Sequence, residues 1–114
     1  MQLSLIFLLP IVAFVSGTSA ADCYSQGGSN RCVDINSLWQ FRQFYCTQEW
    51  QGNGGSKRYN ANNGFGSLFL RSGSFNSQQQ CWDSTENIIK ACFGHKDGGT
   101  WDGSMMQMNI NFCA

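Results

Sequence analysis

The sequence predicts a small α+β domain, in which an antiparallel β-sheet is flanked by α-helices and stabilised by disulfide bonds. Three observations predict it. Residues 34–50 and residues 77–94 repeat apolar side chains at helical spacing, whereas residues 106–112 alternate apolar and polar side chains as a strand does. Six cysteines follow residue 20 in a chain of 114 residues, a number and spacing typical of a disulfide-stabilised domain.

The first predicted helix occupies residues 34–50. Its apolar and cysteine positions share one face: Ile35, Leu38, Trp39, Tyr45 and Cys46. Asp34 is a suitable N-cap, because its carboxylate can accept hydrogen bonds from the first free N–H groups. The glycine-rich run at 52–55 ends the helix, since glycine favours open chain with positive φ.

A β-hairpin is predicted next, with strands near residues 57–60 and 67–71 joined by the turn-rich sequence NANNGFG. In the second of these strands Leu68 and Leu70 share one face, and Phe69 and Arg71 share the other. Apolar side chains on both faces predict a sheet that is covered on both sides.

The second predicted helix follows a cap at Asn76-Ser77 and ends at Gly94. Cys81 and Cys92 are eleven positions apart, which is only about 20° around a helix, so they lie on one stripe three turns from each other. They cannot bond to each other, and each must reach another part of the chain. The sequence leaves the remaining choice of partners open.

The last predicted strands are residues 99–101 and residues 106–113. Met106, Met108, Ile110 and Phe112 form the apolar face of the second strand, and Asp102-Gly103 is a strong hairpin signal between the two. The predicted order is therefore strand or loop, helix, hairpin, helix, hairpin.

Residues 1–20 are typical of a secretory signal peptide. An apolar core at residues 3–15 is followed by the small residues Thr18-Ser19-Ala20, and this core is too short for a membrane span. We expect a secreted, extracellular, single domain at residues 21–114, where the oxidising compartment favours three disulfides. The six cysteines are Cys23, Cys32, Cys46, Cys81, Cys92 and Cys113.

Charge and metal-ligand patterns argue against several classes of partner. Seven Lys and Arg residues balance seven Asp and Glu residues. The sequence shows no basic stripe for nucleic acid and no polybasic patch for a membrane surface. Cys92 and His95 are the only metal-ligand pair with suitable spacing, and the cysteine is expected in a disulfide. We expect no metal, no cofactor, no nucleic acid and no membrane insertion.

An enzymatic function is the weaker interpretation. A small secreted ribonuclease could draw its base, acid and charge-stabilising group from Glu49 or Glu86, His95 and Arg71. The plainer interpretation pairs Glu86 with Lys90 one turn away and places His95 beside a helix C-terminus. The sequence contains no nucleophile elbow and no phosphate-binding glycine loop. We therefore expect no catalysis.

The polar residues favour a ligand rich in hydroxyl groups. Aromatic rings pack on the C–H face of a pyranose, and planar Asn, Asp, Gln and Arg groups meet neighbouring hydroxyls. Trp101 sits at a turn, either as an exposed stacking ring or as a lid on the core. The candidate carbohydrate-binding residues are Trp101, Asp102, Asn109, Asn111, Tyr59, Asn60 and Arg71.

Three segments, CYSQGGSNRCVDINSLWQFRQFYC, CWDSTENIIKAC and GGTW with MNINFC, resemble the small secreted fungal glycan-binding proteins of the shaggy-ink-cap mushroom lectin type. The resemblance covers nearly all of the chain after residue 20. It implies an αβα sandwich, paired monomers whose sheets join into one antiparallel sheet, and carbohydrate binding without catalysis. N-acetylated sugars are among the ligands that it implies.

The leading hypothesis is thus a secreted lectin that binds glycans on cell-surface glycoproteins or glycolipids, expected as a homodimer because an exposed strand edge invites a symmetric partner. The alternative is a cysteine-stabilised toxin or effector that acts on a protein or membrane target.

Overall fold

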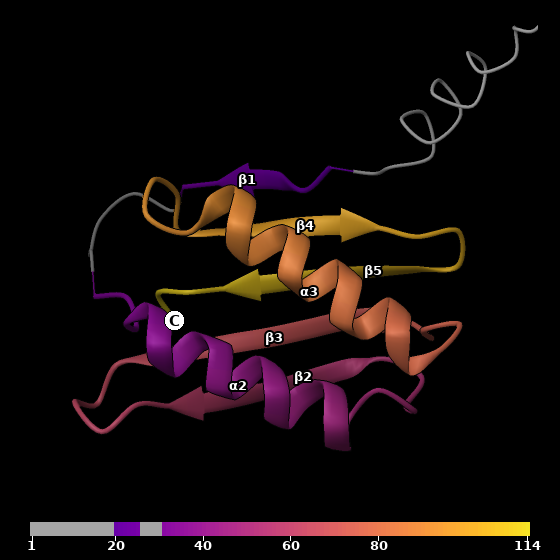
Figure 1. Ribbon diagram of the computed structural model, residues 1–114, viewed down its shortest axis with the longest axis horizontal. Helices are drawn as coiled ribbons and strands as arrows, with labels where there is room; N and C mark the ends of the chain where they lie inside the picture. Colours follow the sequence, from indigo (N-terminus) through magenta and orange to yellow (C-terminus); the bar gives the residue numbers. More distant parts are fainter. Residues whose placement is uncertain (1–19, 26–30) are drawn as a thin grey trace, which may run out of the picture.

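The computed structural model describes residues 20–25 and 31–114, which form five strands and two helices (Figure 1). The predicted signal peptide lies outside this part of the chain, apart from Ala20. The elements in order are β1 (Asp22–Tyr24), α2 (Ile35–Gln48), β2 (Gly55–Asn60), β3 (Gly66–Gly73), α3 (Gln78–Cys92), β4 (Gly98–Asp102) and β5 (Met106–Asn111).

The five strands form a single antiparallel sheet in the order β1-β4-β5-β3-β2. Both predicted hairpins are confirmed: β2 pairs with β3, and β4 pairs with β5. The two hairpins meet where β5 pairs with β3, and β1 extends the sheet beyond β4. The predicted antiparallel α+β architecture is confirmed.

Both predicted helices are also confirmed, with shorter C-terminal ends. The carboxylate of Asp34 accepts from the backbone N–H of Ser37 over 3.0 Å, and the hydroxyl of Ser77 caps α3 in the same way at Gln80 over 3.2 Å. Helix α2 ends two residues before the predicted boundary at residue 50, where the N–H of Glu49 closes the last turn on the carbonyl of Tyr45. None of the described helices is long and apolar enough to cross a membrane.

Both helices cover the same face of the sheet (Figure 1). Strand register places Phe69, Ile110 and Gly99 in one row on that face. The ring of Tyr45 in α2 lies 5.1 Å from the ring of Phe69, and Ile88 in α3 lies over Gly99. The described residues therefore form two layers, a helical layer and a sheet, so the prediction that the sheet is covered on both sides is wrong for this part of the chain. We call the uncovered side of the sheet the open face.

The core fills the space between the helices and the sheet. Tyr59 of β2 stacks on Phe41 of α2 at 5.3 Å between ring centroids and meets the edge of Phe69 at 5.5 Å. The most deeply buried apolar side chains come from α2, α3, β3, β5 and the residue that follows β5: Leu38, Phe69, Ile88, Met108, Ile110 and Phe112. The predicted apolar face of β5 is thus confirmed.

Three disulfides connect these layers. Cys46–Cys81 joins the two helices, Cys23–Cys92 joins β1 to the end of α3, and Cys32–Cys113 joins the segment before α2 to the segment after β5. The prediction that Cys81 and Cys92 have different partners is confirmed. All six cysteines are bonded, so none is a free thiol.

Packing raises the pKa of all three tyrosines. Burial is the main cause at Tyr24 and Tyr45, and it raises the pKa of Tyr59 from 10.0 to about 12, with smaller contributions from Glu49 and Tyr45. The hydroxyl oxygen of Tyr59 is buried and has no hydrogen-bond partner among the described residues. A phenolate at this position would lack both water and a donor.

Stability is therefore expected to fall in alkali. A tyrosine whose folded pKa is raised stabilises the fold fully below its unfolded pKa near 10, and this contribution is lost as the pH rises toward about 12. Phenolate absorbance followed together with circular dichroism should show ionisation of Tyr59 only as the protein unfolds. Tyr59→Phe keeps the ring and should resist alkali better. Reversible ionisation of all three tyrosines near pH 10 in a folded chain would contradict this expectation.

Candidate functional site

The open face carries alternating aliphatic and polar side chains from the two central strands. In the β3–β5 ladder Leu68 lies opposite Asn111, Leu70 opposite Asn109, and Ser72 opposite Gln107. Partners in an antiparallel ladder share a face, and Phe69 and Ile110 occupy the helix-covered side. The open face therefore combines apolar surface with amide and hydroxyl groups, and no described helix covers it (Figure 1).

A shallow hollow of about 440 Å³ lies on this face between β2, β3 and β5. Its volume falls within the range of small-molecule sites. The hollow is lined by Gly55, Ser56, Leu70, Arg71, Ser72, Gln107 and Asn109. Leu70 offers apolar contact, while Ser56, Ser72 and the two amides offer hydrogen-bonding groups.

Asn109 is held in a fixed position at this hollow. The hydroxyl of Tyr24 in β1 donates to Asn109 Oδ1 over 2.6 Å and also lies 3.3 Å from the carbonyl oxygen of Ile110. Burial is the main cause of the raised pKa of Tyr24, and the nearby Asp97 raises it further. The ordinary pKa of a tyrosine is already 10.0, so the hydroxyl is protonated and able to donate at neutral pH. The amide nitrogen of Asn109 has no partner in the described part of the chain.

Polar contacts continue along the face in both directions. Gln107 Nε2 donates to Asp102 Oδ1 over 2.8 Å at the end of the β4–β5 hairpin. Further along β2, Arg58 donates through Nε to Asn60 Oδ1 over 3.0 Å. Strand register places both pairs on the open face with Leu68 and Leu70. Both pairs add planar donors and acceptors to the face that carries the hollow, and Gln107 also lines the hollow itself.

The sheet divides the seven candidate carbohydrate-binding residues into two groups. Four lie on the open face: Asp102, Asn109, Asn111 and Asn60. Three lie on the helix-covered face: Trp101, Tyr59 and Arg71. Because a sheet separates the two groups, the structure does not bring all seven residues into one site.

The three residues on the covered face make internal contacts. The half-buried rings of Trp101 and Tyr59 pack against the core. Arg71 is only 6% exposed, and its guanidinium donates to the carbonyl oxygens of Gly73 and Glu49 over 3.0 and 2.9 Å. Arg71 also lies over the ring of Phe75 at 4.8 Å. Its donors thus hold the segment after α2 onto β3.

Several residues of the open face were not among the sequence candidates, including Tyr24, Ser56, Leu70 and Gln107. For Gln107 and Leu70 a signal existed, because each alternates with core residues on a strand and must face the other way. The positions of Tyr24 and Ser56 on this face follow only from the order and register of the strands, which the local sequence does not contain.

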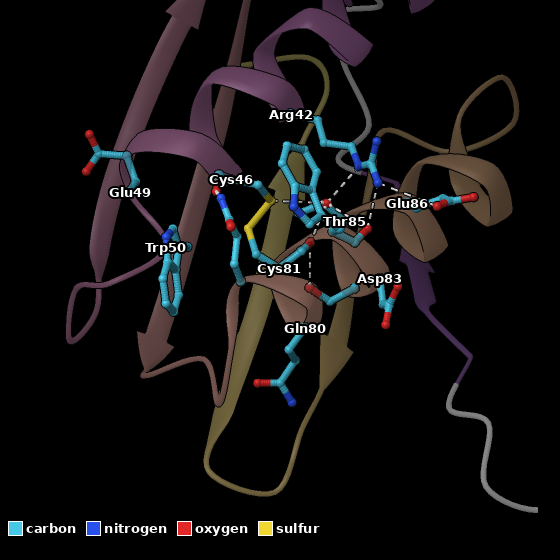
Figure 2. The surroundings of a disulfide bond; sticks show 12 residues. Arg42, Cys46, Glu49, Trp50, Gln80, Cys81, Asp83, Thr85 and Glu86 are labelled. Atoms are coloured by element: carbon cyan, nitrogen blue, oxygen red, sulfur yellow. Dashed lines mark hydrogen bonds and ion pairs between the residues drawn. A yellow bond between two sulfur atoms is a disulfide. The ribbon is translucent and has the colours of Figure 1, made fainter.

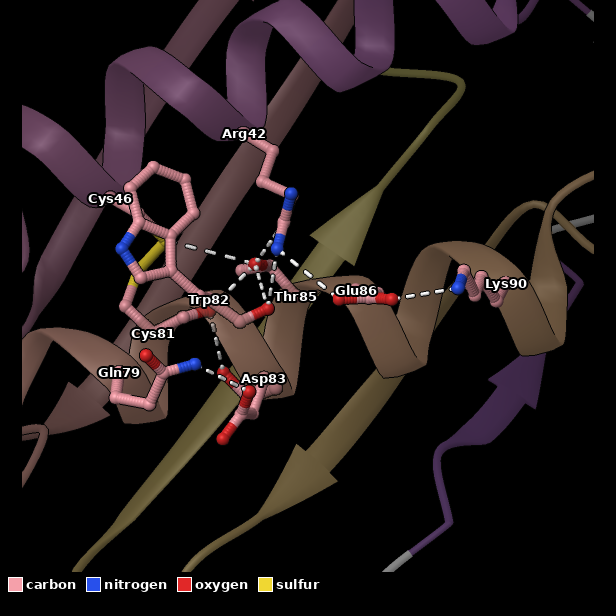
Figure 3. A network of polar contacts seen from close by, with 10 residues as sticks. Arg42, Cys46, Gln79, Cys81, Trp82, Asp83, Thr85, Glu86 and Lys90 are labelled. Atoms are coloured by element: carbon pink, nitrogen blue, oxygen red, sulfur yellow. Dashed lines mark hydrogen bonds and ion pairs between the residues drawn. A yellow bond between two sulfur atoms is a disulfide. The ribbon is translucent and has the colours of Figure 1, made fainter.

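The residues considered for ribonuclease chemistry make other contacts. Glu86 pairs with Lys90 at 2.7 Å and with Arg42 at 3.5 Å (Figure 3). The hydrogen bond from Lys90 is the largest cause of the lowered pKa of Glu86. His95 Nε2 lies 3.0 Å from the carbonyl oxygen of Ala91. These contacts match the plainer interpretation of both residues.

The sulfur atoms are unsuited to metal binding. Cys92, the sulfur of the only metal-ligand pair in the sequence, is bonded to Cys23. Cys32, Asp97 and Cys113 lie close together, but the two cysteines form a disulfide and therefore offer no thiolate.

Comparison with known proteins adds a family. A family model described as alpha-galactosyl binding lectin matches residues 33–114, which include α2, α3 and all strands except β1. No curated protein matches the chain.

Proposed function

Since the chain belongs to the alpha-galactosyl binding lectin family, we propose that it binds terminal α-galactosyl residues of glycans at the hollow on its open face. Such binding requires no bond to break. It requires planar hydrogen-bonding groups at fixed positions, with apolar surface beneath the C–H groups of the sugar.

The observation that carries this proposal is the fixed amide of Asn109 beside Leu70. Tyr24 orients the Asn109 side chain, so the amide nitrogen can donate to a sugar hydroxyl with little further loss of conformational freedom. Gln107 and Asp102 extend the row of polar groups toward the hairpin turn. Leu70 lies opposite Asn109 and can contact the apolar side of a pyranose.

The setting that we propose is extracellular. Residues 1–20 direct secretion in this proposal, and the three disulfides agree with an oxidising compartment. The ligands are then glycoproteins or glycolipids of cell surfaces. The resemblance to mushroom lectins of the shaggy-ink-cap type belongs to the same proposal, with N-acetylated sugars as the competing ligand class.

Asn109→Ala is expected to weaken binding of methyl α-galactoside at the open face at least about tenfold, since it removes a fixed donor and releases the hydroxyl of Tyr24. Isothermal titration calorimetry measures this, after a glycan array with both α-galactosyl and N-acetylated sugars. Asn36→Ala, an exposed asparagine on α2, is the control and should bind normally. Unchanged affinity in Asn109→Ala would remove the site from the open face. An array without any saturable signal would remove glycan binding itself.

We further propose a symmetric dimer formed through β2. This six-residue strand ends the sheet, and its outer edge has no partner strand in the described part of the chain. A second copy could pair there and extend the sheet, which would place two hollows side by side because Ser56 of β2 lines the hollow. Light scattering at micromolar concentration should give twice the mass of one chain, whereas a monomer with and without sugar would contradict the dimer.

A further inference from the structure

The outer surface of the helical layer carries an aromatic and charged cluster that the open face does not use. Trp39 and Arg42 come from α2, while Trp82 and Glu86 come from α3. The guanidinium carbon of Arg42 lies 5.3 Å from the ring centroid of Trp39 and 4.9 Å from that of Trp82. We call these four residues the tryptophan–arginine cluster.

Hydrogen bonds fix the guanidinium in place (Figure 3). Arg42 donates through Nε to Thr85 Oγ1 over 3.1 Å, and through Nη2 to the carbonyl oxygen of Trp82 over 2.9 Å. Nη2 also lies 3.5 Å from Glu86 Oε1. Nη1 donates to no atom in the described ranges, and the side chain of Arg42 is 18% exposed. Its two N–H groups at Nη1 therefore have no acceptor among the described residues and can donate to a ligand that reaches them.

The Cys46–Cys81 disulfide lies beside this cluster and already locks the two helices together (Figure 2). Both sulfur atoms belong to fully buried residues, whereas Trp39 and Trp82 are only half-buried. Joining the helices therefore does not explain why two indole rings remain partly in water. Half-exposed indoles beside fixed N–H groups are suited to stacking and hydrogen bonding with an incoming molecule.

The local charge favours a neutral ligand. Arg42 and Lys90 are balanced by Glu86 and by Asp83, which lies near enough to act on Arg42. An anion would meet two carboxylates, and a cation would meet the guanidinium and the ammonium group. A neutral ring with hydroxyl groups can use the indoles, the Nη1 donors and the carboxylate acceptors together.

We propose that the tryptophan–arginine cluster is a second glycan subsite, which takes a hexopyranose on the helical layer while the open face takes another. This inference rests on the proposed lectin function. The cluster and the open face lie on opposite layers of the fold, so one chain could connect two glycan-bearing surfaces without forming a dimer.

The test uses the indole N–H signals of the four tryptophans in ¹H–¹⁵N spectra of the whole protein, titrated with methyl α-galactoside and with methyl N-acetylglucosaminide. The signals of Trp39 and Trp82 should shift saturably with one of these sugars. The same shifts should appear in the Asn109→Ala variant, which lacks the proposed donor of the open face. Arg42→Lys keeps the charge but loses the planar donors. The affinity that the Trp82 titration reports should fall at least about tenfold, while the side-chain amide of Asn109 titrates as in the unchanged protein. Phe44→Leu, at an aromatic residue of α2 that is 47% exposed, is the matched control.

The outcomes separate the two proposals. Unmoved indole signals of Trp39 and Trp82, with a saturable shift at Asn109, would overturn the second subsite and leave the open face intact. Shifts at the two indoles without any response at Asn109 would support the subsite and overturn the site on the open face. An Arg42→Lys variant with unchanged Trp82 shifts would assign Arg42 to helix packing and overturn its role in the subsite. If neither sugar shifts the signals of Trp39, Trp82 or Asn109, both proposed sites are overturned.

Discussion

Replacing Cys46 and Cys81 together by alanine is expected to lower the free energy of unfolding by about 4 kcal/mol. The bridge joins residues that are 35 positions apart, and its loss returns conformational freedom to the unfolded chain. Both side chains are completely buried between the helices, so the change also leaves a small void. A loss of this size is a large part of the stability of a small domain. Urea unfolding without reductant measures it.

The Cys32–Cys113 pair is the matched comparison for this variant. Its bridge spans 81 positions, and loop entropy alone predicts a slightly larger loss than for Cys46–Cys81. Both cysteines are half-buried, so the packing loss should be smaller. A Cys46/Cys81 double variant that unfolds at the urea concentration of the unchanged protein would contradict the stabilising role of the bridge.

Arg71→Met is expected to lower the free energy of unfolding by about 3 kcal/mol, because partly buried carbonyl groups lose a buried, charged donor. The lost bonds reach the carbonyl oxygens of Glu49, Trp50 and Gly73, so the turn after α2 should loosen first. Methionine keeps much of the apolar stem and its contact with Phe75. Thermal unfolding measures the loss, and hydrogen exchange around residues 49–55 locates it.

Arg58→Met provides the control on the neighbouring strand. Arg58 is exposed and bonds to Asn60 and to the carbonyl oxygen of Ala114, so its replacement should cost less than about 0.5 kcal/mol. Equal losses for the two arginine variants would show that burial of Arg71 does not determine its contribution.

Local patterns predicted most of the elements, because each one depends on neighbouring residues. Asp34 and Ser77 cap their helices, and the Asp102-Gly103 hairpin joins β4 to β5 in register. Disulfide partners could not be predicted, since Cys23 reaches Cys92 only after β1 has joined β4. Pairing of distant segments is a property of the fold and leaves no local signal.

The candidate site was only partly predictable for a related reason. Residue type suggested both Arg71 and Asn109, yet the two lie on opposite faces. For Arg71 the face was predictable from the sequence. Arg71 lies two positions after Phe69 in the same strand, so both side chains share a face, and Phe69 is fully buried. The side on which Trp101 lies depends on its register with Met108 and Arg71, which only the assembled sheet defines.

The position of β5 has a consequence for biosynthesis. β5 comes last among the described strands, yet it lies between β4 and β3 in the sheet. During translation the earlier strands can form only two separate ladders, β1 with β4 and β2 with β3, each with a bare edge. The sheet can therefore be completed only after β5 has left the ribosome. A chain stalled before residue 106 would expose strand edges that are prone to aggregation. Folding is expected to be a late event, with the Cys32–Cys113 bridge closing after the sheet is complete.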